Sequence, residues 1–510
     1  MSASKTSVAS GEKSVNAPSK RLADLLAGIA DAAGLDAARE ITVSGLSLDS
    51  RRVRAGDAFF ALQGGSRHGI EFAPAASASG AAVILAERSV GLRSHPLFPA
   101  PVVEIDDLHE YAGEIAARFF DRPSQSMKVI GVTGTNGKTS VVQLLAVALH
   151  DLGARAATIG TLGAGQVGEI REGERTTPDA ISVQALLAEF RDAGVDRVAM
   201  EVSSHAVSQG RVNAVAFDVA AFTNLTRDHL DYHGTMEAYG AAKAKLFAWP
   251  NLRAAVINID DAFGRKLAQG LPAHVQSLRC SIDNTEAELV ATQVRTGGDG
   301  LHFHLRTPWG EGDVSTHLLG RFNVANLLVV AGCLGALGCD FAQIHRALTN
   351  ANPVIGRMNR LGGGALPLIV VDYAHSPDAL EQALKSLRAH CAGKLVCVFG
   401  AGGERDRGKR PQMAAIAEAL ADRVVVTDDN PRGEDGDAIV AQILDGFVHR
   451  DAVVVQRDRA RAIAAALRIA VAGDVVLIAG KGHERYQEIA GIKHPFDDMV
   501  VARGVLEANA

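Results

Sequence analysis

The 510-residue sequence predicts an α/β protein of three domains, with a doubly wound parallel sheet in its central domain. Short apolar runs alternate with helix-compatible segments along most of the chain, as they do in βαβ units. A glycine-rich turn directly follows one of these runs, at residues 134–140. The same alternation begins again past Gly356, which indicates a further α/β unit of the same kind.

The N-terminal part predicts a small α/β domain over residues 21–123. Its apolar runs AFFAL, AAVILAE and PVVEI are separated by glycine-rich turns, which is typical of short strands. Arg122, Pro123 and Ser124 mark the predicted boundary. Residues 1–20 are rich in Ser, Ala and Lys and hold no apolar run, so we expect a disordered tail there, not a signal peptide.

Residues 124–356 predict the central domain, whose strands would be VIGVTG, RVAMEVS, VAAFTNL and AAVINID. Residues 357–510 predict a C-terminal Rossmann-like α/β domain with the strands LIVVDYA, KLVCVFGAGG, RVVVTDDNP and DVVLIAGKG. Open parallel sheets bind ligands beyond the carboxyl ends of their strands. The polar clusters at those ends are therefore the candidate sites.

The segment MKVIGVTGTNGKTS predicts a P-loop, in which bare backbone N–H groups bind phosphate at a helix N-terminus. Lys138 would contact the β and γ phosphates of ATP, and the Thr139 hydroxyl would ligate Mg²⁺. Val132 stands where the common loop has glycine, so this is a variant loop. A plain strand-to-helix turn is the alternative, but helical spacing of the apolar residues that follow favours phosphate binding. The predicted ATP contacts in the loop are Gly134, Thr135, Asn136, Gly137, Lys138, Thr139 and Ser140.

Composition agrees with a globular enzyme that acts on small molecules. The formal charge of −6 leaves no basic footprint for nucleic acid. Five cysteines without CxxC spacing argue against a disulfide framework and a zinc cluster, which favours a reducing cytoplasm. The most apolar long stretch, 324–338, is too short to span a membrane and predicts a buried helix. We expect a cytoplasmic monomer without a membrane or nucleic-acid partner.

Further motifs follow the P-loop in a definite order. They are TTP from Thr176, EVSSHAVSQGRV from Glu201, TNLTRDHLDYHG from Thr223, AYGAAKAKLF from Ala238, GRFNVANLL from Gly320, GRM from Gly356, DYAHSPDAL from Asp372, GGERDRGKRPQM from Gly402, DNPR from Asp429 and GKGHE from Gly480. In this order and spacing they resemble the Mur ligases of bacterial cell-wall synthesis. The likeness runs from about residue 44 to near the C-terminus, and it is strongest to the branch adding meso-diaminopimelate to UDP-N-acetylmuramoyl-L-alanyl-D-glutamate.

The resemblance implies an amide ligase that uses ATP and Mg²⁺. A carboxylate is a poor electrophile, so ATP would first convert it to an acyl phosphate, which the amine of the amino acid then attacks. Such a site supplies mainly position and charge stabilisation in a cleft that excludes water. The N-terminal domain would bind the UDP-sugar, the central domain ATP and the C-terminal domain the amino acid.

The resemblance also implies the catalytic residues Lys138, Glu201, His229 and Lys243. Mg²⁺ would be held by Thr139, Glu201, His229 and Lys243, the last as a carbamate (N6-carboxylysine). Without the resemblance, Glu201 would be an ion-pair or capping residue and Lys243 a solvated surface charge. His229 with His233 could suggest zinc, but phosphates and oxygen ligands suit Mg²⁺ better.

Three more residues match ATP contacts of the family: Asn326 in FNVAN, Arg357 in GRM and Asp372 in DYAHSPD. Helix capping is the alternative role for Asn323 and Asn326, and a strand-end turn for Asp372. Asn359 departs from the acidic residue that often follows GRM in the family.

Hydroxyl, amide and guanidinium groups suit an anionic substrate rich in hydroxyl groups. The residues that match contacts to the UDP-muramoyl peptide are Leu48, Ser50, Gly65, Ser66, Arg67, Thr176, Thr177, Ser203, Gln209 and Arg211.

The choice of amino acid depends on Arg432 in DNPR. Diaminopimelate carries a second carboxylate that lysine lacks, and a guanidinium can bind it with two parallel hydrogen bonds. With lysine the arginine would stay desolvated and unpaired. The alternative is a turn with a surface arginine. The residues matched to diaminopimelate are Arg405, Asp429, Asn430, Pro431, Arg432, Gly480 and Glu484, with Glu484 suited to the distal ammonium.

Rival functions come from other classes. A P-loop kinase would transfer the γ-phosphate to a hydroxyl without needing an amine, and a nucleotide-switched binding protein would use hydrolysis only to change shape. Within the ligases, the lysine-adding relative and a folylpolyglutamate synthase are the alternatives. DNPR argues against the first of these, and the uridine-type N-terminal domain against the second.

Overall fold

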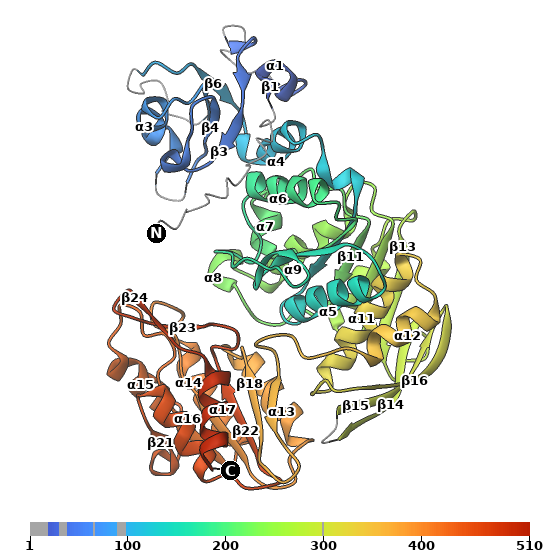
Figure 1. The fold of residues 1–510 in the computed structure, drawn as a ribbon, viewed down its shortest axis with the longest axis vertical. Helices are drawn as coiled ribbons and strands as arrows, with labels where there is room; N and C mark the ends of the chain where they lie inside the picture. The colour runs from blue at the N-terminus through green and yellow to red at the C-terminus, as the bar shows by residue number, and fades with distance from the viewer. Residues whose placement is uncertain (1–18, 30–37, 65–66, 89–97, 298–299, 510) are drawn as a thin grey trace, which may run out of the picture. The chain divides into compact units, whose positions relative to one another are not determined.

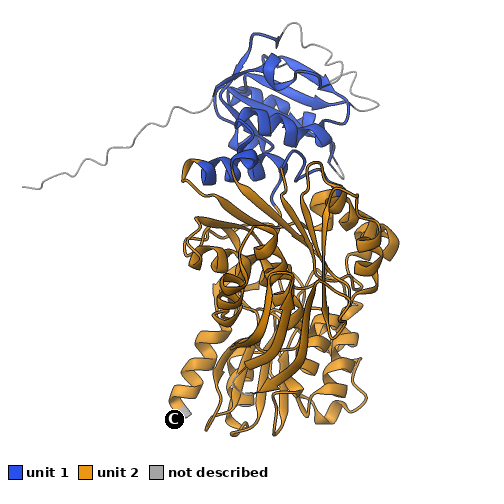
Figure 2. Ribbon diagram, turned by 90° about the vertical axis from the view of Figure 1, so that its right-hand side faces the viewer, with its two compact units in different colours: residues 1–126, 178–191, 208–215 blue, residues 127–177, 192–207, 216–510 orange. Residues whose placement is uncertain are grey.

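The computed structural model describes residues 19–29, 38–64, 67–88, 98–297 and 300–509. The chain divides into two compact units (Figure 2). Unit 1 holds residues 1–126, 178–191 and 208–215, and unit 2 holds 127–177, 192–207 and 216–510. Two short segments that follow the P-loop in sequence thus pack with the N-terminal part. The central and C-terminal sheets both belong to unit 2.

Unit 1 contains a four-stranded parallel sheet in the order β3-β4-β5-β6, as expected for a small α/β domain. Its elements are β1 (Lys20–Arg21), α1 (Leu22–Leu25), β2 (Thr42–Val43), β3 (Gly45–Ser47), η1 (Ser50–Arg52), β4 (Asp57–Ala61), η2 (Gly69–Phe72), α3 (Ala73–Ala78), β5 (Val83–Glu87), β6 (Val102–Ile105), α4 (Leu108–Phe119), η3 (Pro123–Ser126) and most of α6 (Ala180–Asp192). Phe60 and Leu85 pack with Ile115 of α4, whereas Phe59 and Ile84 pack with α3. Alternate residues of each strand therefore bury against different helices.

Unit 2 begins with a ten-stranded sheet in the order β16-β15-β14-β13-β12-β11-β7-β10-β8-β9. Its strands are β7 (Lys128–Thr133), β8 (Ala156–Gly160), β9 (Gly163–Gln166), β10 (Arg197–Glu201), β11 (Val219–Phe222), β12 (Ala254–Asn258), β13 (Gln276–Ile282), β14 (Leu289–Gly297), β15 (Gly300–Thr307) and β16 (Gly310–Thr316). The four predicted strands are β7, β10, β11 and β12, and they are parallel, as expected. The antiparallel edges β8-β9 and β14-β15-β16 were not predicted.

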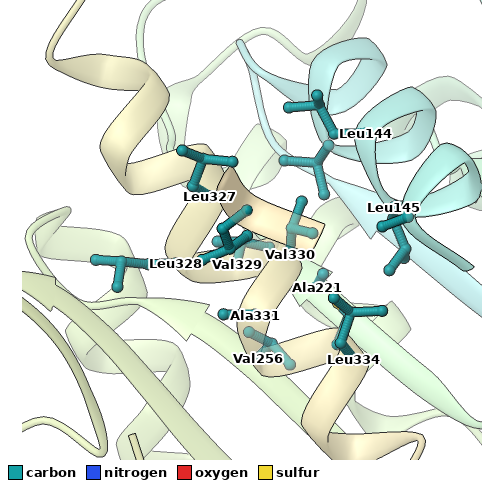
Figure 3. Close-up of a cluster of buried hydrophobic side chains, with 14 of the residues drawn as sticks. Leu144, Leu145, Ala221, Val256, Leu327, Leu328, Val329, Val330, Ala331 and Leu334 are labelled. Carbon is teal, nitrogen blue, oxygen red and sulfur yellow. The ribbon is translucent and has the colours of Figure 1, made fainter. Parts of the chain in front are cut away.

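Helices accompany this sheet, and several of them pack on it. They are α5 (Lys138–Asp151), α7 (Ser204–Ser208), α8 (Leu230–His233), α9 (Met236–Ala244), η4 (Lys245–Ala248), α10 (Ala262–Gln269), α11 (Phe322–Ala336) and α12 (Phe341–Thr349). Figures 1 and 3 show α5 beside α11, where Leu145 and Val330 pack over the sheet residue Val256. A Cβ on Gly332 would lie 2.5 Å from Val256, so α11 needs a glycine there. The predicted buried helix at 324–338 is confirmed as the main part of α11.

The rest of unit 2 contains a six-stranded sheet in the order β17-β18-β22-β19-β20-β21, parallel except for β17. Its strands are β17 (Asn359–Gly362), β18 (Leu368–Asp372), β19 (Leu395–Phe399), β20 (Arg423–Val426), β21 (Val454–Val455) and β22 (Val475–Ala479), followed by the hairpin β23 (Tyr486–Ile489) and β24 (Ile492–Pro495). Its helices are α13 (Pro377–Arg388), α14 (Lys409–Leu420), α15 (Gly436–Leu444), η5 (Arg450–Ala452), α16 (Arg459–Arg468) and α17 (Asp498–Asn509). One core joins the sheet to α13, α14 and α15, and another joins it to α16 and α17, which confirms a doubly wound sheet.

All five cysteines are free. In the part of the chain that the structure describes, the helices are all too short or too polar to cross a bilayer.

A fully buried ion pair joins α16 to α17. Arg459 donates from Nε and Nη2 to the two carboxylate oxygens of Asp498, each at 2.7 Å, and both side chains have zero exposure. Arg459 also donates to the carbonyl oxygens of Ala479 (3.0 Å) and Asp428 (3.3 Å). The pair thus ties the two helices to the ends of β22 and β20.

Asp498→Ala should lower the free energy of unfolding by about 3 to 5 kcal/mol, because Arg459 would keep a buried charge without its partner. Glu381→Ala is the control, since its ion pair with Lys385 on α13 is exposed and contributes under about 1 kcal/mol. Urea unfolding of both variants gives the comparison. Similar small losses in the two would show that the buried pair is dispensable.

Candidate functional site

The P-loop connects β7 to α5 and depends on two glycines with positive φ, Gly134 (147°) and Gly137 (86°). A Cβ on Gly134 would lie 1.9 Å from the Thr223 hydroxyl oxygen, and one on Gly137 would lie 2.5 Å from Oδ1 of Asn326. Any side chain at either position would therefore collide with a neighbouring element as well as strain the backbone.

The residues after β11 hold the P-loop in place. The backbone N–H groups of Thr135 and Asn136 donate to the carbonyl and side-chain oxygens of Asn224, at 2.8 and 2.9 Å. The Thr223 hydroxyl donates to the carbonyl oxygen of Asn136 at 2.6 Å. Since β11 is the neighbour of β7 in the sheet, the loop is fixed by the adjacent strand end.

Two lysines donate to the same carbonyl oxygen of the P-loop. Nζ of Lys243, on α9, lies 2.8 Å from the Gly134 oxygen, and Nζ of Lys138 lies 3.0 Å from it and 2.9 Å from the oxygen of Thr135. Lys243 is only 1% exposed and lies 4.4 Å from the centre of the Tyr239 ring. Burial, followed by the charge of Lys138, lowers the pKa of Lys243 well below its usual value. The prediction of a surface lysine, made without the resemblance, is wrong.

Glu201 is a buried carboxylate at the end of β10. Its Oε1 accepts the Thr161 backbone N–H at 2.8 Å, and its Oε2 accepts the Thr161 hydroxyl at 3.2 Å. Burial lowers the pKa of Lys138, and the nearby charges of Glu201 and Asp228 oppose that shift. Glu201 therefore lies within the electrostatic reach of the P-loop lysine. Thr161, which orients it, was not among the predicted residues.

His229 follows Asp228 in the loop before α8, with φ of 52°. Burial lowers its pKa, Asp228 opposes the shift, and both lysines strengthen it. His205 packs edge-on against the His229 ring at 4.8 Å. His233 lies near His205, and its Nε2 atom shares a hydrogen bond with the Ser204 hydroxyl at 2.9 Å.

No group of three or more His, Cys, Asp or Glu side chains arranged to hold a metal ion occurs among the described residues. The residue types nevertheless fit Mg²⁺, since a carboxylate, a hydroxyl and phosphate oxygens are hard ligands. A carbamate on Lys243 would replace a crowded amine by an anion with two such oxygens. The fit of a metal to this site therefore improves with that modification.

A pocket of about 280 Å³ adjoins the P-loop. Its lining comes from the P-loop, the ends of β11 and β12, α11 and α13, and includes Asn136, Gly137, Ser140, Asn326, Arg357 and Asp372. Phe322, Val329 and Ala383 add apolar surface to this lining. A pocket of this kind beside a phosphate loop suits the base and sugar of a nucleotide.

Arg357 lines the pocket. Its Nη2 donates to the Thr139 hydroxyl at 3.2 Å, and the guanidinium stacks on the Tyr373 ring at 4.7 Å. Its buried Nε has no partner within the described part of the structure. Asp372 accepts the Met358 backbone N–H at 2.8 Å, and burial raises its pKa. An arginine with a donor to spare beside Thr139 suits a phosphate group.

The asparagines near this pocket have structural roles. Asn326 donates to Asn323 at 2.9 Å, and Asn323 donates to the carbonyl oxygen of Leu319 at 2.7 Å. Oδ1 of Asn359 accepts the backbone N–H of Gly356. An aspartate could accept the same hydrogen bond, so the departure from the family at this position leaves the turn intact. Asp378, which was not predicted, accepts hydrogen bonds from Asn136 (2.6 Å) and Thr226 (3.1 Å).

Three loops at the carboxyl ends of β19, β20 and β22 gather the predicted amino-acid contacts. Lys481 has zero exposure and donates to Asn430 Oδ1 at 2.8 Å and Glu484 Oε2 at 3.0 Å. Asn430 also donates to Glu484 at 2.8 Å. Glu484 thus already has a cationic partner in Lys481, which the sequence reasoning missed although it lies in the GKGHE motif. A Cβ on Gly480 would lie 2.8 Å from Asp429, so the loops pack closely.

Arg432 is 19% exposed and is held on several sides. Its Nη1 donates to the Gly403 carbonyl oxygen at 2.7 Å, and its Nε lies 3.4 Å from Oε2 of Glu488. Its backbone, with φ of 53°, pairs with hairpin strand β23 through Glu488 and Ala490. Arg432 is therefore not a loose surface arginine. Arg405, on the neighbouring loop, is exposed.

The residues predicted to bind the UDP-muramoyl peptide fall in both units. Thr176, Thr177 and Ser203 lie near Glu201 in unit 2, where Thr177 donates to the Glu201 carbonyl oxygen at 2.8 Å. Leu48, Ser50, Arg67, Gln209 and Arg211 belong to unit 1, and Gly65 and Ser66 lie outside the described residues. Arg67 pairs with Glu71 at 2.6 Å, and Arg211 donates to Gln209.

Three family models match the chain: "Mur ligase family, catalytic domain" at residues 42–120, "Mur ligase middle domain" at 132–334 and "Mur ligase, glutamate ligase domain" at 356–482. The UDP-N-acetylmuramoyl-L-alanyl-D-glutamate--2,6-diaminopimelate ligase of Xanthomonas campestris is 57% identical over 92% of this chain and 95% of its own length. The Pseudomonas aeruginosa protein of the same name is 52% identical over 92% of this chain and 96% of its own.

A solved structure of a UDP-N-acetylmuramoyl-L-alanyl-D-glutamate--2,6-diaminopimelate ligase superposes with a TM-score of 0.69 at 38% identity, covering 92% of this chain and 96% of the other. The three family models match successive parts of the chain, and the relatives match nearly the whole chain. Sequence motifs, fold and comparisons agree, and this chain belongs to the Mur ligase family.

Proposed function

We propose that this protein is an ATP-dependent ligase that joins meso-diaminopimelate to UDP-N-acetylmuramoyl-L-alanyl-D-glutamate with release of ADP and phosphate. The observation that carries the proposal is the P-loop with its two crowded amines, next to an arginine with an unpaired donor and a nucleotide-sized pocket. The substrates follow from the names of relatives that are 52–57% identical. The chain works as a monomer in the cytoplasm, with its domains at 21–123, 124–356 and 357–510.

The P-loop and Arg357 bind the phosphates of ATP. Lys138, now bonded to its own loop, turns to the β and γ phosphates when they arrive, because a phosphate is a stronger acceptor than a carbonyl. The substrate carboxylate attacks the γ-phosphorus, ADP leaves, and an acyl phosphate forms. The amine then attacks the acyl carbon, phosphate leaves and, once the nitrogen loses a proton, an amide remains.

Mg²⁺ would be held by Thr139, Glu201, His229 and carbamylated Lys243, and it would offset the charge of the phosphates. Thr161 keeps Glu201 in one orientation through two hydrogen bonds. Carbon dioxide adds only to a neutral amine, and burial keeps Lys243 neutral at a lower pH than an exposed lysine. The same low pKa would leave Lys243 a poor cation, so a carbamate suits its surroundings.

The amino acid binds between the three loops at the ends of β19, β20 and β22. Arg432 and Arg405 face the carboxylate that distinguishes diaminopimelate from lysine. Asn430, Glu484 and the loop backbone at Asp429, Pro431 and Gly480 contact the rest of the amino acid. By the match of their motifs to the family, Leu48, Ser50, Gly65, Ser66 and Arg67 are assigned to the uridine part of the UDP-muramoyl peptide, and Thr176, Thr177, Ser203, Gln209 and Arg211 to its muramoyl-peptide part.

Phosphate release from ATP with Mg²⁺ and the UDP-muramoyl dipeptide should require meso-diaminopimelate and should be absent with L-lysine or without an amine. Mass spectrometry should find a product that is heavier by one condensed diaminopimelate residue. A preference for lysine would overturn the role of Arg432. Phosphate release that ignores the amine would instead support a kinase or a nucleotide-driven switch.

Arg432→Ala should raise the barrier for diaminopimelate by about 2 to 3 kcal/mol, roughly a 30- to 150-fold fall in kcat/KM, because a charged carboxylate would lose its partner. The KM for ATP should stay within about twofold, since Arg432 does not line the nucleotide pocket. Arg485→Ala is the matched control, because its side chain is 72% exposed beside the same loops. Equal losses toward ATP and diaminopimelate would contradict the specificity role.

Lys243 should take up ¹³C-labelled bicarbonate and give a carbamate signal by NMR, which Lys243→Ala should lack and Lys245→Ala should keep. Lys245 directly follows the last residue of α9 and is exposed. The signal should persist at neutral pH and disappear as the pH falls through the lowered pKa of Lys243, because only the neutral amine reacts. Full activity of Lys243→Ala would remove the carbamate from the mechanism.

A further inference from the structure

Arg410 is a fully buried charge beside the proposed amino-acid site. It lies in the first turn of α14 with zero exposure. Its Nη1 donates to Glu434 (3.0 Å) and Gln442 (2.7 Å), and its Nη2 donates to Glu434 (3.2 Å) and to the Gly402 carbonyl oxygen (3.1 Å). Burying a guanidinium costs free energy unless the group is paired and hydrogen-bonded, so the position of Arg410 depends on these partners.

Glu434 joins two loops of that site. It lies two residues after Arg432, and its Oε1 accepts the backbone N–H of Glu404 at 2.5 Å. The hydrogen bonds from Arg410, followed by that from Glu404, lower the pKa of Glu434 to about 2. The carboxylate thus stays charged at neutral pH, and it holds the 402–405 loop against the 429–434 loop.

The two loops also touch through their backbones. Gly403 donates from its N–H to the Asn430 carbonyl oxygen at 2.9 Å, and its own carbonyl oxygen accepts Nη1 of Arg432. A Cβ on Gly403 would lie 1.9 Å from the Pro431 carbonyl oxygen, so the loops approach too closely for any other residue. The position of Arg432 therefore depends on where the 402–405 loop lies.

A carboxylate receives parallel hydrogen bonds from guanidinium groups only when these are held within a few tenths of an ångström. Arg405 is on one loop and Arg432 on the other. Glu404 and Arg432 both have positive φ (55° and 53°), a conformation that non-glycine residues keep only when their surroundings enforce it. A contact that holds both loops in place would enforce the positive φ at Glu404 and at Arg432 together.

We propose that Glu434, anchored by Arg410, is a positioning residue that fixes Arg405 and Arg432 for the distal carboxylate of the amino acid. The inference rests on the proposed function, because it assumes that these arginines select the amino acid. It goes beyond that function by assigning discrimination to a buried pair that does not touch the substrate.

The first test compares Glu434→Gln with Gln442→Ala. Both variants change a partner of Arg410, but the hydrogen bond described for Gln442 comes from Arg410 and joins neither loop, so Gln442→Ala controls for the loss of one Arg410 partner. In Glu434→Gln the KM for meso-diaminopimelate should rise by about tenfold or more, while kcat at saturation and the KM for ATP change by less than about twofold. Gln442→Ala should leave all three unchanged within about twofold.

Equal effects of the two variants would overturn the positioning role. So would an unchanged KM for meso-diaminopimelate in Glu434→Gln, or a fall in kcat together with a rise in the KM values for both substrates. Glu434→Asp provides a second variant in case Glu434→Gln does not fold. It keeps the charge beside Arg410 but withdraws the carboxylate from the Glu404 amide by one methylene. Its KM for diaminopimelate should rise in the same direction, and a wild-type value would contradict the proposal.

Amide hydrogen exchange separates this inference from the proposed function, since it needs no substrate. The Glu404 amide should exchange at least about tenfold faster in Glu434→Gln than in the wild type and should be unchanged in Gln442→Ala. If the wild type shows no amine-dependent phosphate release, the proposed function fails and the exchange rates alone decide whether Glu434 locks the loops. Unchanged exchange in Glu434→Gln would remove the lock, whatever the activity.

Discussion

The contact on which the central site depends is the one between the P-loop and the side chain of Lys243. A lysine from α9 reaches the carbonyl oxygen of Gly134, to which the P-loop's own Lys138 also donates. Two amines on one oxygen repel each other, and burial denies them the water that would screen the repulsion. Burial lowers the pKa of both lysines, and the charge of Lys138 lowers that of Lys243 further. The region is therefore arranged to receive negative charge, whether from phosphate or from a carbamate.

The same requirement shapes the backbone around the loop. Gly134 and Gly137 have no room for side chains because Thr223 and Asn326 approach them directly. Thr223 comes from the end of β11 and Asn326 from α11, so the strand order and the packing of α11 must both be correct before the loop can form. The apolar core under α5 and α11 supplies that order through burial, at about 1.5 to 3 kcal/mol for each large side chain.

Close packing also fixes the loops of the C-terminal sheet, but here buried charged side chains take part in it. Its carboxyl ends carry Lys481 and, close behind, Arg459, both with zero exposure and both paired with carboxylates. Such pairs contribute little net stability, but removing one partner is costly, so they fix positions more than they strengthen the fold. The loops that carry Asn430, Arg432 and Glu484 thus rest on a rigid polar layer, as a selective site requires.

The sequence by itself determined the local features. The alternation of apolar runs predicted β7, β10, β11 and β12, and the glycines of 134–140 predicted the P-loop. Both features depend on residues that are neighbours in the sequence, so a local pattern reveals them. The order of the motifs along the chain indicated the Mur ligase family. Only the tertiary structure decided that Lys243 is buried, that Lys481 pairs with Glu484 and that Asp378 lies beside Asn136. The antiparallel edge β14-β15-β16 also appeared only there. Burial and pairing join residues far apart in the chain, so no local pattern contains them.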